Sequence, residues 1–85
     1  MRLREILKNI SKVPEVHLKL GSHYLVVLNE GRRLRCLLYH WMDYKYGGEP
    51  IKDVTKRFEE FPSYLRNLKR ELEAARARVV RIWRM

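Results

Sequence analysis

Arginines cluster directly after a glycine-containing turn signal near the middle of the chain. Arg32, Arg33 and Arg35 follow Asn29-Glu30-Gly31. A guanidinium group stays charged at physiological pH and binds phosphate through two parallel hydrogen bonds. Arginines at the tip of a hairpin can therefore hold a nucleic-acid backbone. The alternative is that their charge only protects an edge strand from pairing with other chains.

A second group interleaves aromatic and basic side chains before a pair of glycines. Tyr44, Lys45 and Tyr46 precede Gly47-Gly48, and Trp41 lies shortly before them. Aromatic faces stack on unpaired bases at about 1–3 kcal/mol each, while cations hold the phosphates. The two tyrosines are therefore predicted stacking residues and Lys45 a phosphate ligand, with coverage of a sheet edge as the alternative. Trp41 is expected in the core.

The last third of the chain is predicted to be a long basic helix, at about residues 63–84. Its apolar positions recur at alternating steps of three and four residues and form a seam of Leu65, Leu68, Leu72, Ala75, Val79 and Ile82. That spacing is typical of a helix with one apolar face. We expect this face to pack on the chain's own sheet, since a small domain needs a helix over it. A homodimer through the seam from Leu65 to Ile82 is the alternative.

The same helix carries the second predicted phosphate-binding group, which consists of Arg76, Arg78, Arg81 and Arg84. Cations near a helix C-terminus also stabilise the helix through its dipole. Because these arginines occupy several sides of one helix, we expect some of them to be structural.

The chain shows no residue pattern that indicates catalysis, a cofactor or a metal. His17, His23 and His40 match no metal-ligand spacing, and no acidic residue clearly accompanies them. A glycine-rich phosphate loop, an H-E-x-x-H motif and a nucleophile elbow are all absent from the sequence. Cys36 is the only cysteine, so neither an intrachain disulfide nor a cysteine-based zinc site can form. We therefore predict a protein that is not an enzyme.

Length and charge narrow the class of protein further. The chain has 85 residues, a formal net charge of +9 and an isoelectric point of about 10.1. This length predicts a single domain over residues 1–85 with a thin core. The charge favours polyanionic partners, with nucleic acid ahead of an anionic membrane. Glutamine is absent and charged residues make up 34%, a composition like that of thermophile proteins.

Secretion and membrane insertion are not predicted. Residues 1–10 are too short and too charged for a signal peptide. The longest strictly apolar run, Tyr24–Leu28, is far too short to span a membrane. Together with the single cysteine, these features predict a cytoplasmic protein without a membrane partner.

A three-stranded antiparallel meander is predicted in the first half of the chain. Apolar and polar residues alternate from Val16 to Leu20, and β-rich residues follow from His23 to Leu28. Gly21-Ser22 fits a two-residue turn between these strands. Asn29-Glu30-Gly31 fits a three-residue turn with its glycine in the left-handed conformation. The return strand should run from Arg32 to about Trp41.

One helix is predicted before the meander in the sequence, and two helices are predicted after it. A short N-terminal helix has one apolar face made by Leu3, Ile6, Leu7 and Ile10. Residues 44–48 are expected to form a loop, after which Pro50 suits the first turn of another helix. The buried stripe of that helix would be Ile51, Val54, Phe58 and Phe61. Pro62-Ser63 would then end it and open the long last helix.

These elements predict an α+β fold, in which the meander carries a short N-terminal helix and two C-terminal helices. The predicted function is non-catalytic binding of nucleic acid through arginine-rich surfaces. RNA within a ribonucleoprotein particle is slightly favoured over DNA because of the aromatic and basic loop.

Three alternatives stay open. The last two helices could form a helix-turn-helix in a dimeric DNA-binding regulator, which would read bases with Tyr64, Arg66, Asn67 and Arg70. The chain could instead be a protein-interaction module with an acidic partner. Lys19–Val27 also resembles the central strands of small basic toxin ribonucleases of the RelE kind, which implies cleavage of messenger RNA on the ribosome. The long C-terminal helix departs from that family's pattern, and none of its catalytic residues can be placed here.

Overall fold

The computed structural model describes the backbone of residues 3–83 and the side chains of residues 5–75. The elements follow in the order α1 (Leu3–Lys12), β1 (Glu15–Leu20), β2 (His23–Asn29), β3 (Arg33–His40), α2 (Trp41–Tyr46), β4 (Lys52–Arg57), a 3₁₀ turn (Phe58–Glu60) and α3 (Phe61–Trp83). This order confirms the predicted α+β class, the short N-terminal helix and the long last helix.

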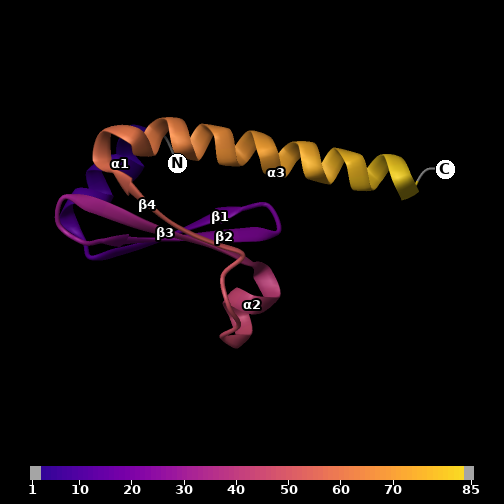
Figure 1. The fold of residues 1–85 in the computed structure, drawn as a ribbon, viewed down its shortest axis with the longest axis horizontal. Helices are drawn as coiled ribbons and strands as arrows, with labels where there is room; N and C mark the ends of the chain where they lie inside the picture. The colour runs from indigo at the N-terminus through magenta and orange to yellow at the C-terminus, as the bar shows by residue number, and fades with distance from the viewer. Residues whose placement is uncertain (1–2, 84–85) are drawn as a thin grey trace.

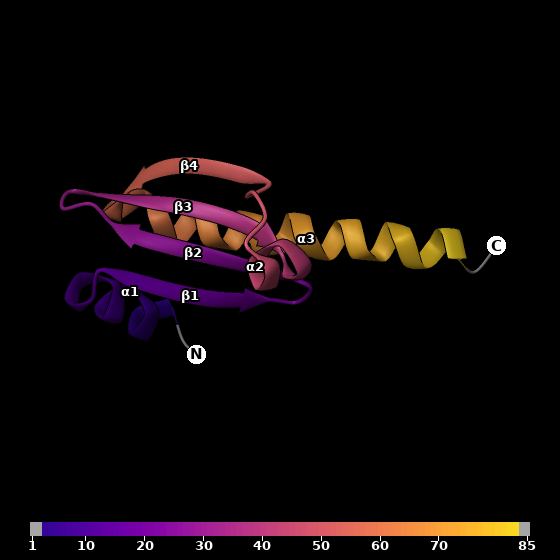
Figure 2. The ribbon, with the colours of Figure 1, turned by 90° about the horizontal axis from the view of Figure 1, so that it is seen from below.

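The strands form one antiparallel sheet in the order β1-β2-β3-β4. Each strand therefore pairs only with its neighbours in the sequence. Figures 1 and 2 show α1 and the first half of α3 on one face of the sheet, and α2 on the opposite face. In the same views α3 continues past the end of the sheet. Within the described residues, no helix has both the length and the apolarity needed to cross a membrane.

The core lies between the sheet and the two helices α1 and α3. Alternate residues of the strands point into it because successive side chains of a strand face opposite ways. Its buried members are Ile6, Ile10, Leu18, Leu25, Val27, Leu34, Cys36, Leu38, Phe61, Leu65 and Leu68. The first half of the seam on α3 thus packs on the chain's own sheet, as predicted. Leu72 is half-buried and Ala75 is exposed, so this packing ends near Leu72.

Both predicted hairpin turns are present, and one is shorter than expected. Leu20 pairs with His23, which leaves Gly21-Ser22 as the predicted two-residue turn. In the second hairpin the N–H of Glu30 donates to the carbonyl of Arg33 at 2.9 Å, so the turn consists of Gly31-Arg32. Gly31 has a φ of 92°, the left-handed conformation expected from its position.

The helix predicted from Pro50 to Phe61 is wrong, because most of this segment forms β4. Val54 lies opposite Cys36 of β3 in the antiparallel register. Pairing gives the backbone of β3 hydrogen-bond partners on its second side, which an amphipathic helix would not provide. Ile51, counted in the buried stripe, is 54% exposed. Strand β4 passes through one 3₁₀ turn directly into α3, so the helix-turn-helix about residues 61–63 does not form.

Residues 41–46 form the short helix α2 where a strand end and a loop were predicted. The helix begins after His40, whose Nδ1 accepts a hydrogen bond from the backbone N–H of Met42 at 3.4 Å. It ends at Gly47, which has a φ of 75° and donates its N–H to the carbonyl of Asp43. Trp41 consequently leaves the sheet and is 42% exposed, so the prediction of a core tryptophan is wrong.

Tyr64 of α3 places a polar group against the core. Its hydroxyl oxygen is buried and has no hydrogen-bond partner among the described residues. Burial, followed by the nearby Cys36, raises the pKa of Tyr64 to about 12. The ring itself makes a favourable contact, since Nζ of Lys56 lies 5.6 Å from its centre.

Replacing Tyr64 with Phe is therefore expected to stabilise the protein. The change removes the unpaired hydroxyl and keeps the ring, so the free energy of unfolding should rise by about 1 kcal/mol. Chemical denaturation of both proteins measures the difference. A lower free energy of unfolding in Tyr64→Phe would show that the hydroxyl makes a hydrogen bond that stabilises the fold.

Candidate nucleic-acid interface

One face of the sheet is open over most of its area. This open face lies opposite α1 and α3, and of the described elements only α2 stands on it, at one end (Figure 1). By strand alternation and register, the residues of β3 and β4 on this face are Arg33, Arg35, Leu37, Tyr39, Asp53, Thr55 and Arg57. Val26 and Leu28 of β2 complete an apolar strip beside them.

Three arginines meet at the end of the open face that is farthest from α2. Arg33 and Arg57 lie directly opposite each other in the β3–β4 register, and Arg32 occupies the adjoining turn. All three are exposed. We call Arg32, Arg33 and Arg57 the arginine end. Among residues 5–75, the ion pairs involve none of these three side chains.

The pairing of Arg33 with Arg57 opposes folding. Like charges directly opposite each other on neighbouring strands repel and destabilise the sheet. A bound anion would remove this repulsion, and a phosphate oxygen suits the planar donors of arginine. At the arginine end, a phosphate would therefore reduce the repulsion between these arginines and would also accept hydrogen bonds from them.

Arg35 shares the open face with Arg33, but its charge is already paired. Its Nε donates to Oδ1 of Asp53 at 3.0 Å, and its Nη2 donates to Oδ2 at 2.6 Å. These hydrogen bonds raise the pKa of Arg35 and hold the pKa of Asp53 below its usual value. In its place Arg57 joins the arginine end, a residue missed because a helix was predicted there.

Tyr44, a predicted stacking residue, is engaged within the protein. Its ring stacks on Tyr24 with centroids 4.1 Å apart and planes 8° apart. Its hydroxyl is 2.7 Å from Nδ1 of His17, whose Nε2 is 2.5 Å from Oε1 of Glu15. The expectation that no acidic residue accompanies the histidines is therefore wrong for His17. This chain of contacts fastens α2 to the sheet.

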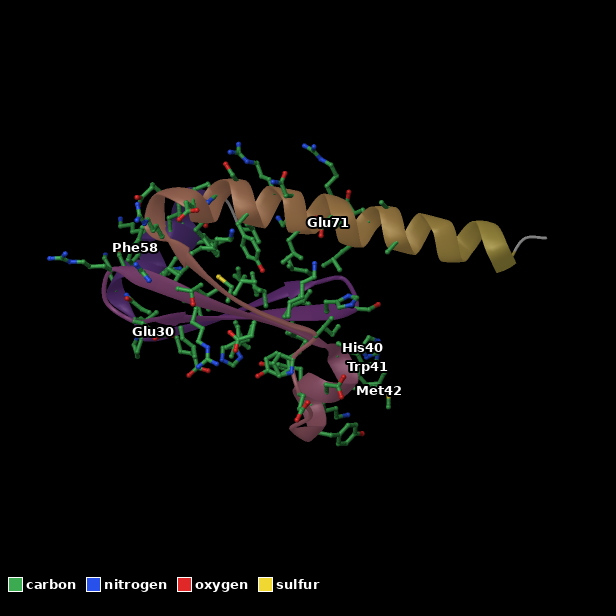
Figure 3. All side chains as sticks on the ribbon, in the orientation of Figure 1. Glu30, His40, Trp41, Met42, Phe58 and Glu71 are labelled. Atoms are coloured by element: carbon green, nitrogen blue, oxygen red, sulfur yellow. The ribbon has the colours of Figure 1, made fainter. Side chains whose placement is uncertain are left out.

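Tyr46 and Lys45 lie on the outer side of α2. Tyr46 is 71% exposed, and Nζ of Lys45 lies 5.5 Å from the centre of its ring. Trp41 adds a second exposed ring, which Figure 3 shows on the flank of α2 beside Met42. These two rings, unlike that of Tyr44, leave aromatic surface available to a ligand.

Helix α3 contributes basic residues on its solvent side. Arg66, Lys69 and Arg70 are exposed in its first half. The predicted phosphate-binding group Arg76, Arg78, Arg81 and Arg84 lies outside the described side chains, so it stays a prediction.

The described part of the chain offers few side chains for metal binding, nucleophilic attack or proton transfer. No group of three or more metal-binding side chains is found in residues 5–75. Burial raises the pKa of the Cys36 thiol to about 11, which keeps it protonated at neutral pH. His23 and His40 are in edge-to-face contact at 5.6 Å, and burial, then the proximity of His40, lowers the pKa of His23.

No protein family, curated protein or solved structure matches this chain.

Proposed function

We propose that this protein binds nucleic acid, and RNA in particular, without chemical catalysis. The observation that carries the proposal is the unneutralised Arg33–Arg57 pair with Arg32 beside it. The net charge of +9 would draw a polyanion towards the whole surface. The arginine end would then fix the position of the phosphate backbone.

RNA is favoured because of what adjoins the arginine end. The open face carries the half-buried apolar residues Leu28 and Leu37, which suit bases better than phosphates. At its other end α2 exposes Trp41 and Tyr46, whose rings can stack on unpaired bases. Unpaired bases are typical of loops and bulges in RNA, where proteins read sequence and shape. A structural RNA within a ribonucleoprotein particle offers such segments.

The salt dependence of binding tests the proposal. If phosphate contacts dominate, log K for a single-stranded RNA should fall linearly with log salt, by about 0.7 per phosphate neutralised. Duplex DNA of equal length gives the comparison, with a slope of about 0.9 per phosphate. Fluorescence anisotropy at several salt concentrations measures both. Binding that is absent at low salt, or independent of salt, contradicts the proposed function.

RNA cleavage is a second candidate, favoured by the contacts among Glu15, His17 and Tyr44. A carboxylate that orients an imidazole, which in turn contacts a hydroxyl, is an arrangement able to move a proton. Incubation with RNA distinguishes cleavage from binding alone. Cleavage that is lost in His17→Ala and in Tyr44→Phe would establish this candidate over the non-catalytic proposal.

A further inference from the structure

The unpaired positive charge of β3 and β4 is confined to one end of the open face. Beyond the arginine end, the next arginine along β3 is Arg35, which Asp53 already binds through two hydrogen bonds. After Arg35, β3 presents only Leu37 and Tyr39 on this face, and β4 adds Thr55 and Asp53. A phosphate backbone that ran along these two strands would find free cations at one end and none further on. The strands therefore provide for one phosphate group rather than for a row of phosphates.

The arginine end calls for more negative charge than one internal phosphate carries. Arg33 and Arg57 are directly opposite each other, a position that places β carbons about 5 Å apart. A phosphodiester within a strand carries one negative charge. A phosphate at the end of a strand is a monoester, with a charge of about −1.5 to −2 at neutral pH and three strong acceptor oxygens. Such a group offsets the charge of both opposed arginines and leaves an oxygen for Arg32 in the adjoining turn.

Two carboxylates adjoin the arginine end without neutralising it. Glu30 precedes the turn, and Figure 3 shows it at the same end of the sheet. Glu60 follows β4, and its Oε1 accepts the backbone N–H of Arg57 at 3.2 Å. Among residues 5–75, no ion pair joins either carboxylate to the arginine end. Because these negative charges weaken the general field, binding here depends on direct contacts with the guanidinium groups, which a terminal phosphate is free to turn towards.

We propose that the arginine end binds the terminal phosphate of an RNA strand, as a phosphomonoester at its 5′ or its 3′ end. This inference rests on the proposed function and specifies which part of the RNA the arginines hold. From the bound phosphate the strand would continue onto the open face, where the half-buried Leu28 and Leu37 suit its first bases. An RNA whose ends carry only hydroxyl groups would lack the second negative charge and bind less tightly.

Single-stranded RNAs that differ only at their ends test this inference. Unlabelled RNAs with a 5′ phosphate, a 3′ phosphate or two hydroxyl ends compete with one fluorescent RNA for the protein. A phosphate at one of the ends should raise affinity about tenfold or more, the worth of one further charge-assisted hydrogen bond. The end that gives the increase identifies the source of the phosphate. A hydroxyl-ended RNA about two nucleotides longer carries a similar total charge and should gain much less.

Each other outcome of this competition is informative. A longer hydroxyl-ended RNA that gains as much as the phosphorylated one would mean that total charge decides, and it overturns the inference. Equal affinity for phosphate and hydroxyl ends also overturns it, while the proposed function stands. Failure of every RNA to bind overturns both.

Single arginine variants locate the preference on the protein. Arg57→Ala should reduce the ratio of the two affinities, for phosphate-ended over hydroxyl-ended RNA, to about one, because one of the opposed charges is gone. Arg66→Ala is the matched control, since it removes an exposed arginine from α3 and should leave the ratio unchanged. Circular dichroism establishes that both variants are folded. A ratio that survives in Arg57→Ala, or that is lost in Arg66→Ala instead, places the phosphate elsewhere and overturns the inference.

Discussion

Replacing Arg32, Arg33 and Arg57 together with Ala is expected to weaken RNA binding by about a hundredfold or more. A charge-assisted hydrogen bond is worth about 1.5–3 kcal/mol, and each 1.4 kcal/mol is a factor of ten in affinity. The sheet should not suffer, because the change removes the repulsion between Arg33 and Arg57. Anisotropy titrations at one fixed salt concentration measure the loss of affinity, and circular dichroism monitors the fold.

A second triple variant provides the control for charge. Arg66, Lys69 and Arg70 are exposed on α3, and replacing them with Ala lowers the net charge by the same amount. This variant should lose only the general attraction that depends on net charge. If it loses more affinity than the variant of the arginine end, α3 is the RNA-binding surface and the open face is not.

Leu65→Ala is expected to cost about 2–5 kcal/mol in the free energy of unfolding. Leu65 is 2% exposed and lies in the core, where α3 meets the sheet. Truncating it removes apolar contacts and leaves a cavity that the surroundings fill only in part. Whole domains are stable by only about 5–15 kcal/mol. The Leu65→Ala variant of so small a domain should therefore be largely unfolded at a moderately raised temperature.

Ile51→Ala is the control for this prediction. It also truncates a large aliphatic residue, but Ile51 is 54% exposed, so its loss should change stability little. Denaturant titrations of both variants and of the unchanged chain give the free energies. Equal midpoints for Leu65→Ala and the unchanged chain would mean that α3 does not pack on the sheet in solution.

The parts of the fold that were predicted correctly depend on local signals. Gly21-Ser22 and Gly31 mark turns because few other residues adopt the required backbone conformations. The alternation in β1 and the seam of α3 each express one buried face at the period of its element. These signals need no knowledge of the rest of the chain, so they can be interpreted from sequence.

Strand β4 and helix α2 were missed because their signals are ambiguous or come from tertiary contacts. Val54 and Phe58 suit one face of a helix, and only the free edge of β3 makes a strand the better choice. The turn that begins α2 depends on the side chain of His40 as a cap, a residue that is rarely considered in this role.

The missed strand β4 and the missed helix α2 also led to errors in the predicted site. Arg32, Arg33 and Tyr46 were identified from the clustering of arginine, aromatic and lysine residues beside turn signals, which is visible in the sequence. The pairing of Arg57 with Arg33 and of Asp53 with Arg35 depends on the register of β4. No local pattern contains that register, so the free arginine and the neutralised one could not be told apart in advance.

The order of the strands has a consequence for how the chain acquires its structure. Because β1 to β4 are adjacent in space in the order in which they are synthesised, each hairpin can close as soon as its second strand is available. Such local connectivity lowers the contact order and favours rapid folding. Until α3 has been made, however, α1 alone covers part of the core face of the sheet. During that interval core residues of the sheet such as Leu25 and Leu34 lack the cover of α3. The packing of α3 on the sheet then protects the newly made chain from aggregation.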